Sequence, residues 1–174
     1  PEPSGVLRLA WTLRAGGAGS GGGLELAPAR RWRVSLVHFS HHDVGYTDLP
    51  SVAARQQLDY LDRVVAYCDE TATYPAAARF RWTLDTSWPL PAWLAGRGQA
   101  AAERLFSLAR EGRVEIPALF AAFNAGLPDL EELVRALTFA CDLRRRHRVP
   151  VRGAVTTDVP GHPWALVPAL ARSG

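Results

Sequence analysis

RVSLVHFSHHD, residues 33–43, joins a short apolar run to a cluster of His and Asp side chains. The run from 33 to 39 is typical of a β-strand, and the polar cluster Ser40-His41-His42-Asp43 follows where that strand would end. Residues at i and i+2 of extended backbone face the same side, so an imidazole and a carboxylate can reach one divalent ion. We therefore predict that His41 and Asp43 are metal ligands.

The chain after residue 30 repeats this order of strand and helix. Apolar patterns and Gly/Pro punctuation predict strands at 33–39, 79–84, 114–120 and 151–156. Helices are expected at 51–71, 99–111 after a stretch broken at Gly96-Arg97-Gly98, 129–147 and 163–172. Such alternation indicates an α/β fold with a parallel sheet. A complete β/α barrel needs about 200–250 residues, so about four βα units predict part of one.

Residues 1–30 differ in composition and form the first expected domain, with 31–174 as the second. The stretch from Gly16 to Gly23 is rich in Gly and Ser, and short alternating segments flank it at 6–13 and 24–27. These segments predict two strands joined by a loose loop, as the end of an upstream β-domain, with a disordered linker as the alternative. The chain begins with Pro and has no signal-peptide pattern, so we interpret it as an excerpt.

The small net charge of the chain excludes few classes of function. Twenty basic residues face 17 acidic ones, every basic residue is Arg, and this composition is typical of a GC-rich bacterial genome. The basic run at 144–148 closes a predicted helix and complements its dipole, so no nucleic-acid partner is expected. No apolar run is long enough to cross a membrane. Cys68 and Cys141 lie on apolar helical stripes and are expected to be reduced, which fits a cytoplasmic protein.

Polar side chains gather where the expected strands end, which is where β/α barrels carry their chemistry. The second strand ends in Asp85-Thr86-Ser87-Trp88, the third leads to Asn124, and the fourth leads to Asp158 and His162. Tyr46 and Trp88 offer flat apolar faces with a polar edge, which suit stacking against a sugar ring or contact with an apolar ligand. We therefore expect a ligand-binding site on this rim.

LVHFSHHDVGYTDLP, residues 36–50, resembles the opening metal motif of glycoside hydrolase family 38, the α-mannosidases. Leu127-Pro128 with Glu131, and Asp158 with Gly161-His162, resemble later segments of that family in the same order. The resemblance covers about 31–174. It implies a seven-stranded β/α barrel, a Zn²⁺ or other divalent ion held by His41 and Asp43, and retaining hydrolysis of α-mannosides. Asp158 would then be the acid/base or a carboxylate that contacts the sugar. On the same rim, we expect Tyr46, Trp88 and His162 to bind substrate.

The chain departs from the family pattern at the nucleophile. Counting back from Leu127 places Asn124 where the family has a catalytic Asp that also binds the metal, and an amide cannot form the glycosyl ester. Asp129 and Glu131 are better explained as residues that open a helix. The family's last His ligand would lie beyond residue 174, so the excerpt alone is expected to be inactive. The alternatives are a polysaccharide deacetylase, whose usual His-x-x-x-His pair is not found, and a carbohydrate-binding barrel without catalysis.

Overall fold

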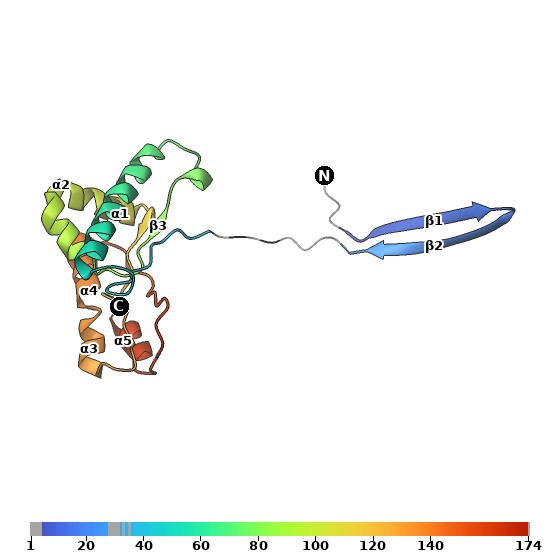
Figure 1. Ribbon diagram of the computed structural model, residues 1–174. Helices are drawn as coiled ribbons and strands as arrows, with labels where there is room; N and C mark the ends of the chain where they lie inside the picture. The colour runs from blue at the N-terminus through green and yellow to red at the C-terminus, as the bar shows by residue number, and fades with distance from the viewer. Residues whose placement is uncertain (1–4, 28–31, 33, 35, 174) are drawn as a thin grey trace. The chain divides into compact units, whose positions relative to one another are not determined.

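The computed structural model describes residues 5–27, 32, 34 and 36–173 (Figure 1). Contacts divide the chain into two compact units, Pro1–Leu36 and Val37–Gly174. The expected strand at 33–39 crosses this division, and its residues 33 and 35 lie outside the described residues.

The first unit contains a β-hairpin. Strands β1 (Leu7–Ala15) and β2 (Ala18–Leu26) pair antiparallel along their whole length. Gly16 and Gly17, with φ of 55° and 83°, form the two-residue turn between them, and two successive positive φ values suit the twist of a hairpin. Two strands were expected here, but the prediction of a loose loop over the glycine-rich stretch was wrong. Most of that stretch belongs to β2.

Trp11 covers part of the glycine-rich strand β2. A Cβ atom on Gly22, which pairs with Trp11, would lie 3.0 Å from the indole ring. The ring therefore covers backbone that has no side chain of its own. Arg8 and Glu25 form an ion pair of 2.7 Å across the two strands.

The second unit begins with two long helices that the sequence predicted. Helix α1 (Pro50–Glu70) starts at a proline, which suits the first turn because its missing N–H has no partner there. Helix α2 (Leu90–Arg110) contains Gly98 with φ 77° and ψ 178°, which are not helical values. The expected break at Gly96-Arg97-Gly98 is thus confirmed as a kink at Gly98.

The third predicted helix, 129–147, is two helices, α3 (Leu130–Arg135) and α4 (Thr138–His147). The backbone carbonyl of Ala136 accepts a hydrogen bond of 2.9 Å from the Phe120 N–H, so an outside partner occupies an acceptor in the break. The expected helix-opening role of Asp129 is confirmed, since Asp129 and Glu132 form a reciprocal capping box. Helix α5 (Leu166–Arg172) occupies most of the predicted last helix, and a short 3₁₀ helix, η1 (Ala76–Ala78), follows α1.

The prediction of a partial seven-stranded β/α barrel was wrong. In the described part of the second unit, the sheet consists of β3 (Trp82–Thr83) and β4 (Val114–Glu115), paired in parallel. The two strands are much shorter than the runs expected at 79–84 and 114–120. No strand forms within 151–156. The described part of the second unit is mainly helical and contains one small parallel sheet.

Extended segments lie beside the two strands without forming regular strands. The Thr83 N–H donates to the His38 carbonyl at 2.9 Å, and the Ala118 N–H donates to the Gly153 carbonyl at 2.9 Å. Pro117 and Pro150 have no N–H to donate to a ladder, and Gly153 weakens a strand. Apolar composition therefore marked segments that run near the sheet, but it overestimated how far they pair.

Two apolar clusters hold the second unit together. The larger joins α1 and α2 to the sheet and to α4, and the smaller joins α3 to α5 and the loop after β4. The larger contains Leu61, Val64, Cys68, Leu84, Leu90, Trp93, Leu105, Phe106, Leu108, Ala109, Val114, Ile116, Leu143 and Val149. The smaller contains Leu119, Ala125, Leu133, Leu137, Leu166 and Ala169. Among the described residues, no helix is both long and apolar enough to cross a membrane.

Candidate functional site

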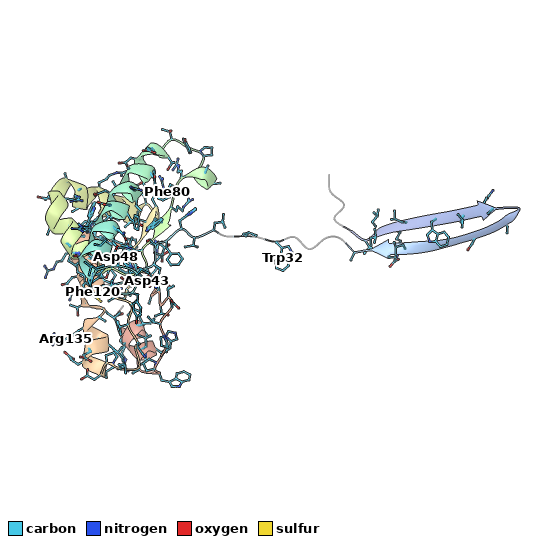
Figure 2. The ribbon with its side chains drawn as sticks, in the orientation of Figure 1. Trp32, Asp43, Asp48, Phe80, Phe120 and Arg135 are labelled. Atoms are coloured by element: carbon cyan, nitrogen blue, oxygen red, sulfur yellow. The ribbon has the colours of Figure 1, made fainter. Side chains whose placement is uncertain are left out.

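The segment that leads into α1 carries the predicted metal ligands, and Figure 2 labels Asp43 on it. Gln57 on α1 anchors this segment, because its Nε2 donates to the Ser40 Oγ and to the His41 carbonyl, each at 3.4 Å. Gly45, with φ 86°, allows the chain to turn after Asp43. The local fold thus fixes the backbone of His41 and leaves the Asp43 side chain 45% exposed.

Asp85, two residues after β3, is the carboxylate on which this segment rests. Its side chain is fully buried, and its Oδ2 lies 2.9 Å from His41 Nδ1 and 3.3 Å from His42 Nδ1. The same oxygen accepts a hydrogen bond of 3.3 Å from the His42 backbone N–H. One carboxylate oxygen therefore organises both histidines.

His42 is a poor candidate for a ligand facing solvent. Its side chain is only 6% exposed, its ring meets Trp88 edge-on at 5.8 Å, and its Nε2 is buried without a hydrogen-bond partner. Burial lowers the pKa of His42, while the Asp85 carboxylate acts in the opposite direction. The ring is therefore neutral at neutral pH.

His41 and Asp43 pass a simple geometric test for a shared divalent ion. The His41 Nε2 and the Asp43 Oδ1 are 3.5 Å apart, which is longer than a good hydrogen bond. Two ligands that each lie about 2.0–2.2 Å from one tetrahedral zinc ion are separated by about 3.4 Å. The pair therefore fits two corners of a zinc site. No group of three or more His, Cys, Asp or Glu side chains in the described ranges is arranged to hold one metal ion.

A cavity of about 690 Å³ brings most of the predicted site residues together. Four separate segments line it: the one before α1, the one after β3, the loop after β4, and the loop before α5. Six of the seven predicted site residues are in its wall, namely His41, Asp43, Tyr46, Trp88, Asn124 and Asp158. The seventh, His162, does not line it and is exposed.

Another cavity, of about 270 Å³, lies beside α4, but neither a histidine nor a carboxylate lines it.

The loops of the two predicted catalytic residues meet at Gly161. A Cβ atom on Gly161 would lie 2.1 Å from the Asn124 Oδ1, and its φ of 87° also favours glycine. The Asn124 Oδ1 accepts a hydrogen bond of 3.0 Å from the Gly126 N–H, so the amide shapes its own loop. Asp158 has a φ of 53°, which is uncommon for a residue with a side chain.

Asp85 is the site residue that the sequence interpretation did not assign a role. The sequence pattern places Asp85 at the end of an expected strand, as it does His41 and Asp43. Within Asp85-Thr86-Ser87-Trp88, however, only Trp88 is expected to contact a ligand. The signal that marks it is position: a carboxylate directly after a buried strand, between Leu84 and Thr86, which are also buried. Such a carboxylate needs hydrogen-bond donors, and the nearby histidines are the donors available.

Comparison with known proteins leaves the family open. No family model matches the chain, and no curated protein or solved structure matches it either. The resemblance to family 38 therefore remains a prediction carried by the motif residues alone. The function has to be argued from the cavity and its chemistry.

Proposed function

We propose that the chain is part of a divalent-metal-dependent glycoside hydrolase that acts on α-mannosides. One observation carries the proposal: residues matched to the family's motifs line a single cavity, although they come from three separate segments of the chain. These residues are His41, Asp43, Tyr46, Asn124 and Asp158. The proposal is independent of the barrel, which the second unit does not form.

His41 and Asp43 are the residues that would hold the ion. When bound, a divalent ion supplies positive charge that attracts and orients the hydroxyl groups of a sugar. The chain's own contribution is to hold one imidazole nitrogen and one carboxylate oxygen 3.5 Å apart at the cavity wall. Asp43 is exposed enough for an ion to reach it from solvent.

The remaining wall residues fit a sugar ring and a proton-transferring group. Tyr46 is 90% exposed, so its aromatic face is free to stack against a sugar, and Trp88 lies in the same wall. Asp158 is exposed and lines the cavity, which suits a carboxyl group that donates a proton to the leaving oxygen and later accepts one from water.

Carbohydrate binding without turnover is the second candidate, and Asn124 favours it. A retaining enzyme needs a carboxylate nucleophile opposite its acid/base, and the residue at the expected position is an amide. Because the Asn124 Oδ1 already accepts the Gly126 N–H, this side chain also has a structural use. A binding protein needs the ion and the aromatic faces but not the nucleophile.

The two candidates are separated by measuring zinc binding and aryl α-mannoside hydrolysis on the whole protein of which this chain is proposed to be a part. Zinc binding with turnover that falls at least 100-fold in Asp158→Asn supports the hydrolase, since general acid–base catalysis contributes about 10²–10⁴-fold. Zinc and mannose binding without turnover supports the binding protein. A chain that binds neither zinc nor mannose contradicts both.

A further inference from the structure

The contacts of the Asp85 carboxylate with His41 and His42 indicate which ring nitrogen of His41 carries the proton. Asp85 is 1% exposed. Its Oδ2 lies within hydrogen-bond distance of the Nδ1 atoms of His41 and His42, and it accepts a hydrogen bond from the His42 backbone N–H. An ionised carboxylate can only accept hydrogen bonds, so the proton of His41 in this contact belongs to Nδ1. The Nε2 of a neutral His41 then carries a free lone pair, and it is this atom that lies 3.5 Å from Asp43.

We propose that Asp85 is a positioning residue that sets the metal affinity of the His41–Asp43 pair. The inference rests on the proposed function, because it concerns the same ion. A metal-binding imidazole must present a lone pair, and a carboxylate that accepts from its other nitrogen both selects that tautomer and fixes the ring. Asp85 does this to His41 from beneath the cavity wall, at 2.9 Å.

The second oxygen of Asp85 gives an independent reason. Oδ1 is buried and has no hydrogen-bond partner in the described part of the chain. The basic side chains found there within reach of Asp85 are His41 and His42, and none is an arginine. Burial of a carboxylate that lacks a permanent cation is unfavourable. A divalent ion on the Nε2 of His41 would place positive charge across the ring from Asp85 and reduce this cost.

His42 shares the carboxylate but not the role. Its Nε2 is buried and has no hydrogen-bond partner in the described residues, whereas the Nε2 of His41 lies 3.5 Å from Asp43. A cavity of only about 10 Å³ adjoins His42, Asp85, Ser40 and Gln57, roughly the least that holds one water molecule. The Asp85 Oδ2 therefore contacts the Nδ1 of both rings, but the two Nε2 atoms differ in their surroundings. We assign the ligand role in the larger cavity to His41.

The test uses the whole protein of which this chain is proposed to be a part, first free of metal and then with zinc alone. Long-range ¹H–¹⁵N NMR at neutral pH reports which nitrogen of His41 carries the proton, and competition with a chromophoric chelator reports the zinc dissociation constant. We expect the Nδ1-protonated form in the wild type. Asp85→Leu should lose that preference and weaken zinc binding about 10–100-fold. Asp48→Asn, which removes an exposed carboxylate from the His41 segment, is the matched control and should change neither reading.

Asp85→Asn covers the case in which the leucine variant does not fold. The amide oxygen can replace Oδ2 as acceptor, so the His41 tautomer should persist, whereas zinc should still bind more weakly because the negative charge is gone. If a folded Asp85 variant binds zinc as tightly as the wild type does, the inference about Asp85 is wrong, but the proposed function is not affected. A wild-type His41 protonated on Nε2 does the same. A wild-type chain that binds no zinc rejects the proposed function, and the inference about affinity with it.

Discussion

The Asp43 side chain makes few contacts that would stabilise the fold. It is nearly half exposed, and its close approach to another side chain in the described residues is the one to the His41 Nε2. A surface carboxylate without hydrogen bonds contributes little to stability. Its value to the protein therefore depends on what it binds.

Asp43→Ala should abolish zinc binding and change the free energy of unfolding by less than about 0.5 kcal/mol. Removing one of two protein ligands leaves His41 alone, and a single imidazole does not retain the ion. Metal content after dialysis and urea unfolding of the metal-free protein check the two halves. Asp48→Ala, on the same segment, should keep its zinc. Retained zinc in Asp43→Ala, or an unfolded variant, would mean that Asp43 is a structural turn residue.

Residue choice within the motif shows what a single sequence can reveal. His41 and Asp43 were recognisable because their types and spacing match a metal pair. The role of Asp85 was not, because it depends on a contact 44 residues away from His41 in the sequence. His162 shows the opposite case: its position after an expected strand suggested substrate contact, but it does not line the cavity.

The kink in α2 is held by one glycine. Gly98 has φ 77° and ψ 178°, a region that residues with a Cβ atom enter only with strain. Gly96 lies in the same helix without a positive φ, and a Cβ there would meet nothing within 4 Å.

Substitution of these two glycines should have opposite effects. Gly98→Ala should destabilise the protein by about 1–3 kcal/mol because the backbone conformation becomes strained. Gly96→Ala should be neutral or stabilise it by up to about 1 kcal/mol, since alanine restricts the unfolded chain and favours helix. Urea unfolding of both variants gives the comparison. Equal effects at the two positions would contradict a strained backbone at Gly98.

The capping box at α3 makes another element-scale prediction. Asp129 accepts from the Glu132 N–H at 2.9 Å, and Glu132 accepts from the Asp129 N–H at 3.0 Å. Asp129→Ala should cost about 1 kcal/mol and increase hydrogen exchange in α3. Glu131→Ala removes only an exposed pair with Arg135 and should cost about 0.3 kcal/mol. If Asp129→Ala left exchange in α3 unchanged, the box would not be what starts this helix.

At the scale of the whole molecule, the two long helices were predictable and the sheet was not. Helical periodicity is local, and α1 and α2 follow it closely. Strand pairing is decided by a partner elsewhere in the chain, which an apolar run cannot specify. The runs at 79–84 and 114–120 pair over two residues each, and Pro117 and Pro150 limit what their neighbours can donate. Alternation of apolar and helical segments therefore implied more sheet than forms.

Asp62 joins the two long helices and makes stability depend on pH. Its carboxylate accepts from Trp93 Nε1 at 2.7 Å and from Arg97 Nε and Nη2 at 3.0 and 2.7 Å. The hydrogen bond from Arg97 is the main cause that lowers the pKa of Asp62, and the one from Trp93 acts in the same direction. The folded protein therefore holds the Asp62 proton less tightly than the unfolded chain does. This stabilisation is complete above the unfolded pKa and is lost as pH falls through the lower folded pKa.

Asp62→Asn should reduce the loss of stability in acid. The pair is partly exposed, so its contribution above the unfolded pKa is at most about 1 kcal/mol. Urea unfolding in steps from neutral pH to about pH 3 should give a smaller slope for the variant in the most acidic steps, since the linkage arises only where the Asp62 carboxyl titrates. Asp59→Asn, one turn earlier on α1, is the comparison variant, because no side-chain hydrogen bond to Asp59 is seen in the described residues. Identical slopes for Asp62→Asn and the wild type would show that the contact between α1 and α2 does not lower the pKa of Asp62 in the folded protein.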